Sequence, residues 1–68
     1  MIGENLLRIL EEKGISVSKF AEQMFVCKTT AYNWIYDRTD PPLWRFVDMC
    51  KVLNVTYDEL LKEVEDEF

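Results

Sequence analysis

Chemistry at a metal ion or a catalytic thiol would have to come from Cys27 and Cys50, because the chain contains no histidine. A structural zinc site is closed by four ligands, and two isolated cysteines cannot supply them. They also make a poor disulfide framework, so we interpret both as reduced thiols that act as small apolar fillers. No nucleophile is paired with a base, and the chain is too short for a large pocket. We therefore expect no metal, no cofactor and no enzymatic activity.

Length and composition limit the fold to one small domain, residues 1–68. Hydrophobic residues make up 49% of the chain, which is enough for one compact core, and the 31% of charged residues is ordinary for a folded protein. No apolar run approaches the roughly 18 residues that span a bilayer, and the N-terminus lacks a basic region followed by an apolar stretch. We expect a cytoplasmic protein without a membrane segment.

Negative charge is concentrated at the C-terminal end. The formal net charge is −5, yet residues 1–57 contain seven acids and seven bases, and residues 58–68 contain six acids and one lysine. Between Ser16 and Arg45 there are four bases and three acids. The middle of the chain is therefore slightly basic. This permits a nucleic-acid partner, although contacts with phosphates would contribute only modestly to the free energy of binding.

Helical spacing of apolar residues and the turn residues between them predict an all-α fold of five short helices. The first helix carries Leu6, Ile9 and Leu10 on one side and ends at Gly14, a residue that readily takes the left-handed conformation. The second begins after a cap at Ser16 or Ser18 and buries Phe20, Ala21 and Met24.

Two further helix starts follow in the second half of the chain. In "DPP", Asp40 suits a cap and proline suits the first turn of a helix that ends near Asn54. We expect its buried side to comprise the following residues: Leu43, Phe46, Val47, Cys50 and Leu53. Trp44 lies off that stripe. "TYDE", residues 56–59, has the pattern of a capping box and opens the acidic last helix and tail, residues 57–68.

The stretch "AEQMFVCKTTAYNWI", residues 21–35, fits either one long helix or two short ones. Phe25, Val26 and Ile35 widen the apolar stripe around a single helix, and a helix of about 20 residues would extend about 30 Å, too far for its neighbours to cover. Two short helices crossing at Ala21, a small residue, resolve both problems. We predict a turn that is filled by Val26 and a second helix that starts at Cys27.

Several short segments follow one another in a characteristic order and spacing over most of the chain, from about Leu6 to Leu61. They are "EEKGIS", Phe20-Ala21, Val26, Trp34, Pro41 and "CKVLNVTYDELL". In this order they resemble the lambda-repressor-like, Cro-type helix-turn-helix DNA-binding domains, also called the XRE family. The resemblance implies a compact five-helix domain with a central helix-turn-helix motif at about residues 17–36.

In such domains the second motif helix, here about residues 28–36, lies in the major groove of double-stranded DNA. The matching positions that would contact bases are Lys28, Thr29, Tyr32 and Asn33. Those that would contact the DNA backbone are Ser18, Lys19, Tyr36, Arg38 and Arg45. The resemblance thus implies a small sequence-specific transcriptional regulator, phage-repressor-like, that binds a palindromic operator as a homodimer. Tyr57, Leu61, Val64 and Phe68 recur near helical spacing and could form the dimer seam.

Three positions depart from the family pattern. Val17 replaces a frequent glutamine that grips phosphate, Cys27 replaces a serine or threonine cap, and Phe25 occupies a turn position that is usually glycine. Since a bulky residue is disfavoured at positive φ, either the turn is reshaped or Phe25 is partly exposed. Val17, Phe25, the acidity and the Tyr32/Tyr36 pair favour an alternative, in which the same fold binds a protein, as an antirepressor or inhibitor does, and has little affinity for DNA.

Overall fold

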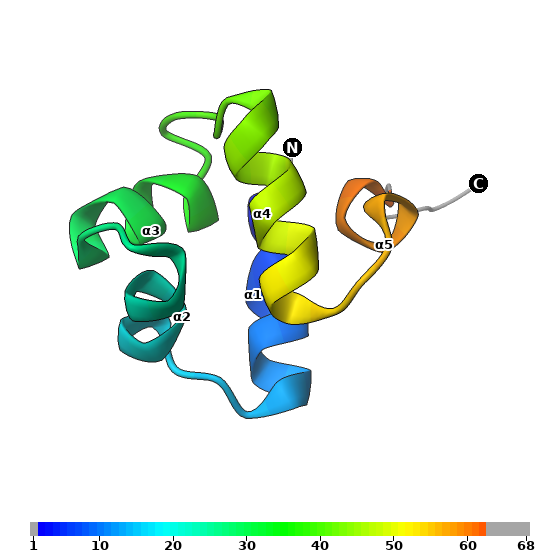
Figure 1. Cartoon of the computed structure of the whole chain (residues 1–68), viewed down its shortest axis with the longest axis horizontal. Helices are drawn as coiled ribbons and strands as arrows, with labels where there is room; N and C mark the ends of the chain where they lie inside the picture. The colour runs from blue at the N-terminus through cyan, green and yellow to red at the C-terminus, as the bar shows by residue number, and fades with distance from the viewer. Residues whose placement is uncertain (1, 63–68) are drawn as a thin grey trace.

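The computed structural model describes residues 2–62, and these residues form five helices and no strand (Figure 1). The helices are α1 (Gly3–Lys13), α2 (Val17–Met24), α3 (Lys28–Ile35), α4 (Leu43–Leu53) and α5 (Tyr57–Leu61). The prediction of an all-α fold with five short helices is confirmed.

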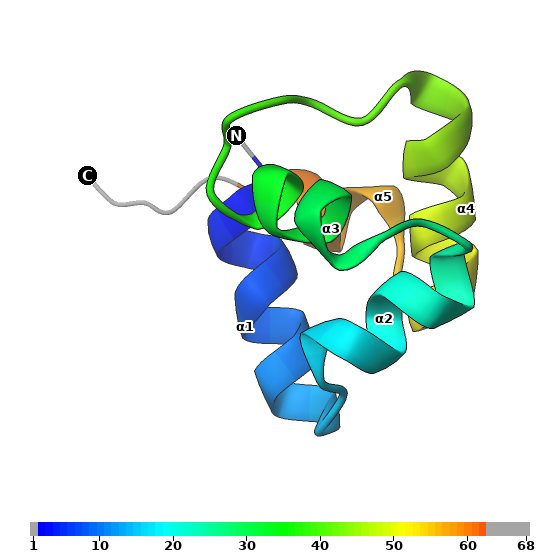
Figure 2. The same cartoon turned by 90° about the vertical axis from the view of Figure 1, so that its left-hand side faces the viewer.

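In Figure 1 the long helices α1 and α4 lie in the middle, with α2 and α3 on one side and α5 on the other, and Figure 2 shows α2 and α3 lying between α1 and α4. Each helix turns its apolar stripe inward, and Phe20, Leu6 and Leu60 are fully buried. Since α2 and α3 pack on one another and also on α4 and α1 respectively, the four helices share one core. That core fixes the position of α3 in the molecule.

Three helices end with the same left-handed turn, at Gly14, Phe25 and Asn54. In each turn the N–H of the following residue donates to a carbonyl five positions back, as from Ile15 to Leu10 at 2.9 Å. This hydrogen bond is typical of the Schellman motif, which satisfies carbonyls that a helix end leaves free. The predicted ends at Gly14 and near Asn54 are therefore confirmed.

Side-chain caps begin two of the helices. The Ser16 hydroxyl accepts from the Lys19 N–H at 3.0 Å, so Ser16 caps α2 and Ser18 lies within its first turn. Thr56 and Glu59 form the capping box that the sequence predicts at the start of α5. The structure thus decides between the two serines that the sequence left open.

The predicted start of α4 is wrong. Its N-cap is Pro42, with extended backbone, and Asp40 makes no cap. A proline disfavours helical backbone in the residue before it, so the pair Pro41-Pro42 delays the helix until Leu43. As a result Leu43 is 77% exposed and not buried as expected, whereas Met49, Cys50 and Leu53 form the buried side with Phe46 and Val47 half-buried.

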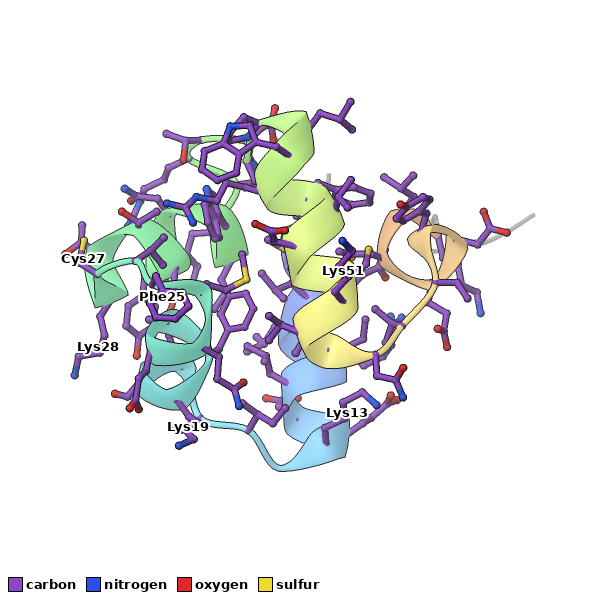
Figure 3. The ribbon with its side chains drawn as sticks, viewed as in Figure 1. Lys13, Lys19, Phe25, Cys27, Lys28 and Lys51 are labelled. Atoms are coloured by element: carbon purple, nitrogen blue, oxygen red, sulfur yellow. The ribbon has the colours of Figure 1, made fainter. Side chains whose placement is uncertain are left out.

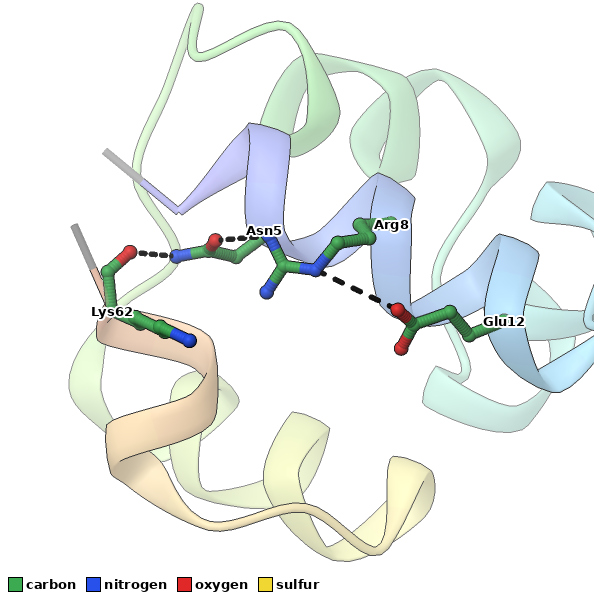
Figure 4. Close-up of polar contacts among 4 residues, drawn as sticks. All are labelled: Asn5, Arg8, Glu12 and Lys62. Carbon is green, nitrogen blue, oxygen red and sulfur yellow. Dashed lines mark hydrogen bonds and ion pairs between the residues drawn. The ribbon is translucent and has the colours of Figure 1, made fainter. Parts of the chain in front are cut away.

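A buried amide ties the short helix α5 to the start of the chain (Figure 4). Asn5 is 2% exposed, and its Nδ2 donates to the carbonyls of Leu60, at 2.9 Å, and Lys62. Its Oδ1 accepts from Arg8, which also lies 3.9 Å from Glu12. Asn5 therefore satisfies carbonyls at the end of α5, a role that the sequence did not reveal.

Candidate nucleic-acid interface

The stretch from Ala21 to Ile35 is two helices joined by a tight turn. Phe25 takes φ 58°, ψ 42°, and the N–H of Val26 donates to the Ala21 carbonyl at 3.0 Å. The turn therefore keeps its geometry despite the aromatic residue, and the Phe25 side chain, 89% exposed, extends into solvent. Val26 packs against the core, as predicted, and Cys27 is the N-cap of α3.

The crossing of α2 and α3 depends on small and apolar residues. Ala21 is 2% exposed and Ala31 is fully buried, and neither side chain extends beyond a methyl group, so neither limits how closely α2 and α3 can pack. Trp34 and Ile35 are also buried and pack into the shared core. The burial of Ala21 in the shared core agrees with the expected crossing, and the side chain's position against the second motif helix stays a prediction.

With Ala31, Trp34 and Ile35 turned inward, α3 presents the opposite face to solvent. Lys28, Thr29, Tyr32 and Tyr36 are exposed on or just beyond this helix, and Asn33 is half-buried at the edge of the face. The rings of Tyr32 and Tyr36 stack with centroids 5.9 Å apart and planes at 10°. The structure therefore brings together all four residues predicted to contact bases.

The residues predicted to contact phosphates lie on α2, at and after the end of α3, and on α4. Ser18 and Lys19 are exposed on the first turn of α2, and Figure 3 shows Lys19 and Lys28 on the same side of the molecule. Lys19 also lies 3.9 Å from Glu22, a weak pairing because both side chains are more than half exposed. Arg38 is exposed after α3, and its guanidinium carbon lies 5.1 Å from the centre of the Tyr36 ring.

A family model described as the Cro/C1-type HTH DNA-binding domain matches residues 5–66. The chain belongs to this family. It is therefore a DNA-binding regulator of the Cro/C1 type, and α2 and α3 are the helices of its helix-turn-helix motif. No curated protein and no solved structure matches the chain significantly.

Arg45 has a structural role in this Cro/C1-type domain that the sequence did not indicate. Its Nη1 donates to the Met24 carbonyl at 3.0 Å, at the C-terminal end of α2, and its guanidinium carbon lies 4.4 Å from the centre of the Trp44 ring. Arg45 is thus half-buried and links α4 to the motif. If Arg45 contacts a phosphate, as expected from the sequence, it would do so through its other N–H groups.

The start of the second motif helix is capped less completely than that of the first. Cys27 makes no side-chain hydrogen bond to the helix backbone, although its Sγ lies 3.3 Å from the Thr30 hydroxyl. This hydroxyl lowers the pKa of the exposed Cys27 thiol, because its hydrogen bond to the sulfur stabilises the thiolate. The prediction that Cys27 is an apolar filler is wrong, whereas Cys50 is buried, and burial raises the pKa of its thiol.

The end of α3 is held by the N-terminus of the chain. Gly3 donates its N–H to Asp37 Oδ1 at 3.1 Å, and a Cβ at Gly3 would clash with the Ile35 carbonyl. Asp37 itself takes a positive φ of 58°. No pattern in the sequence pointed to this contact, because Gly3 and Asp37 lie 34 residues apart.

Residues 2–62 of the Cro/C1-type domain contain neither a metal-binding cluster of side chains nor a membrane-spanning helix. No group of three or more histidine, cysteine, aspartate or glutamate side chains could hold a metal ion in this part of the chain. No helix among these residues is long and apolar enough to cross a membrane.

Proposed function

We propose that the chain is a sequence-specific transcriptional regulator, phage-repressor-like, that places α3 in the major groove of an operator. The exposed face of α3 carries this proposal, because a recognition helix must present side chains to base edges while its other side is buried in the domain. Trp34 and Ile35 are buried in the domain core, whereas Tyr32 and Lys28 are exposed to solvent.

The residues proposed to contact bases offer different chemistry. Lys28 donates to guanine acceptors, Asn33 pairs with the N6 and N7 atoms of adenine, and Thr29 contacts a polar group or a thymine methyl. Tyr32 adds an aromatic ring to the same face. Their order along α3 would let the helix distinguish neighbouring base pairs.

The residues proposed to contact phosphates lie at the edges of that face. The N-terminus of α2 offers free N–H groups together with Ser18 and Lys19. Tyr36, Arg38 and the remaining N–H groups of Arg45 complete the set at the other edge. These contacts would set the register of the domain on DNA without reading its sequence.

A palindromic operator would be bound by two copies, so we propose a homodimer in the cytoplasm. Tyr57 and Leu61 on α5 are 53% and 56% exposed, which leaves an apolar surface on the side of the molecule opposite α3. The other two residues expected in this seam, Val64 and Phe68, lie outside the described residues.

The first test is a titration of the intact protein against random duplex DNA at low salt. Lys19→Ala and Arg38→Ala should weaken binding to all sequences alike and flatten the salt slope by about one unit each. Lys13→Ala and Lys51→Ala are the matched controls, since Figure 3 shows both lysines away from α3. Equal effects of all four changes would contradict the proposed orientation.

Sequence reading is tested with duplexes selected from a random pool. Asn33→Ala should cost about 1–3 kcal/mol on the preferred duplex and relax the preference at the base pair it contacts. The same change should leave binding to random DNA almost unaltered. A uniform loss on every sequence would assign Asn33 to the backbone instead.

The second candidate function is a protein-binding module on the same fold. It is favoured by the 89% exposure of Phe25 and by the exposed tyrosine pair, since exposed aromatic residues are typical of protein interfaces. If the intact protein shows no binding to duplex DNA at low salt, this candidate replaces the first. Changes at Tyr32 or Tyr36 would then abolish a protein complex.

A further inference from the structure

The centre of the exposed face of α3 is aromatic. Lys28, Tyr32 and Tyr36 follow one another at intervals of four residues, so they lie along one line of the helix surface. Tyr32 is 39% and Tyr36 59% exposed. A line of aromatic rings therefore runs along the surface proposed to enter the groove, with hydrogen-bonding side chains at Lys28, Thr29 and Asn33 beside it.

Neighbouring groups hold the Tyr32 ring in place. It is packed against the nearly parallel ring of Tyr36, with centroids 5.9 Å apart. Tyr36 in turn contacts Arg38, whose guanidinium carbon lies 5.1 Å from the ring centre, a distance that permits a cation–π interaction. The Tyr32 ring is thus prepositioned, which reduces the entropy lost when it contacts a ligand.

In the major groove, the apolar group that distinguishes base pairs is the C5-methyl group of thymine. A ring surface cannot read guanine or adenine by hydrogen bonds, but it gains by removing a methyl group from water. A cytosine that is methylated at C5 presents the same group in the groove. The chemistry of Tyr32 therefore fits a pyrimidine with a C5-methyl group.

We propose that Tyr32, supported by Tyr36 and Arg38, reads the C5-methyl group of a pyrimidine in the operator. The inference rests on the proposed function, in which α3 enters the major groove. Tyr32 is the residue in contact, because it lies one turn nearer than Tyr36 to the N-terminal end of α3, the end at which a recognition helix faces the bases. Tyr36 is a positioning residue whose hydroxyl remains available to the backbone of the DNA.

The test uses the unaltered protein and a duplex selected from a random pool. Each thymine of that duplex is replaced in turn by deoxyuridine, which removes the methyl group and leaves every hydrogen-bonding atom in place. At one or two positions the affinity should fall about fourfold, the value expected for one buried methyl group. Cytosine at those positions should bind more tightly when it carries a C5-methyl group than when it does not.

Variants assign the effect to the ring. Tyr32→Phe should keep the fourfold preference for thymine over deoxyuridine, Tyr32→Ala should abolish it, and Tyr36→Ala should reduce it. Lys28→Ala is the matched control from the same line of α3, because it should weaken binding while leaving the preference intact. A preference that survives Tyr32→Ala would overturn the inference.

Three other outcomes distinguish failure of this inference from failure of the function on which it rests. If the selected duplex binds tightly and every deoxyuridine duplex binds equally well, the methyl reading is wrong and the DNA-binding regulator stands. If Tyr32→Phe weakens binding as much as Tyr32→Ala, the hydroxyl makes the contact and the inference is again overturned. Absence of binding to any duplex would reject both proposals.

Discussion

Phe25 is a residue whose side chain and backbone conformation conflict. Its φ of 58° lies in the left-handed region, which costs a residue with a Cβ about 1–2 kcal/mol relative to glycine. Its ring is 89% exposed, so packing of the ring in the domain offsets little of that strain energy. The aromatic side chain therefore weakens the isolated domain, which agrees with a role in contacting a partner.

Substitution of Phe25 should separate the two effects. Phe25→Ala keeps the strained backbone and loses an exposed ring, so we expect the free energy of unfolding to change by less than about 0.5 kcal/mol. Phe25→Gly also relieves the strain and should be about 1 kcal/mol more stable than the alanine variant. Urea denaturation measures both differences. A large loss in Phe25→Ala would show that the ring is packed in the domain.

The two helices of the motif differ in how their first turns are capped. Ser16 caps α2 with a hydrogen bond of 3.0 Å to the Lys19 N–H, and Cys27 at the equivalent position of α3 makes none to the backbone. Since sulfur is a weak acceptor, the first N–H groups of α3 are less well satisfied. The same N–H groups are near the residues proposed to contact DNA.

Cys27→Ser should stabilise α3. A serine hydroxyl accepts from the backbone N–H three residues later, so we expect the free energy of unfolding to rise by about 1 kcal/mol in urea denaturation. Ser16→Ala is the reference for the opposite change in α2 and should cost about 1 kcal/mol. Equal stability of Cys27→Ser and the parent protein would mean that a serine hydroxyl cannot reach that N–H.

The crossing of α2 and α3 requires a small residue at position 21. Ala21→Leu adds three carbon atoms where the side chain is 2% exposed, and the overpacked helices should lose about 1–3 kcal/mol of stability. Thermal melting of Gln23→Leu, an exposed position of the same helix, is the matched control. If Ala21→Leu melts like the parent protein, the close approach of the two helices is wrong.

Charge is distributed unevenly over the whole molecule. Residues 63–68 contain four acids, Glu63, Glu65, Asp66 and Glu67, and no base, so their removal changes the formal net charge from −5 to −1. Exposed charges act on one another over about 10 Å at 0.1 M salt and farther at lower salt. An acidic segment therefore opposes the approach of any part of the chain to DNA.

Deletion of residues 63–68 should strengthen binding to non-specific DNA at low salt, because it reduces repulsion of the phosphates. The gain should disappear as salt is raised, which fluorescence anisotropy at several salt concentrations can follow. A full-length variant with the four acids changed to Gln or Asn is the matched control and should bind equally tightly. Weaker binding of the deletion alone would indicate that Val64 and Phe68 support a dimer.

The sequence alone determined the helices and most of their ends. Gly14, Asn54 and the capping box at Thr56 act through hydrogen bonds within a few residues, so their effects can be read locally, whereas the choice of Ser16 over Ser18 as the cap of α2 needed the structure. The start of α4 was missed because two successive prolines act on the residues before them. The order of motifs was sufficient to indicate the Cro/C1 family and the line of candidate residues on α3.

Tertiary structure decided what each helix end contacts. The bonds from Asn5 to the end of α5, from Arg45 to the end of α2 and from Gly3 to Asp37 join residues 21–57 positions apart, and no local pattern specifies such pairs. Packing of the core fixes these distances, because side chains far apart in sequence meet only when the helices have docked.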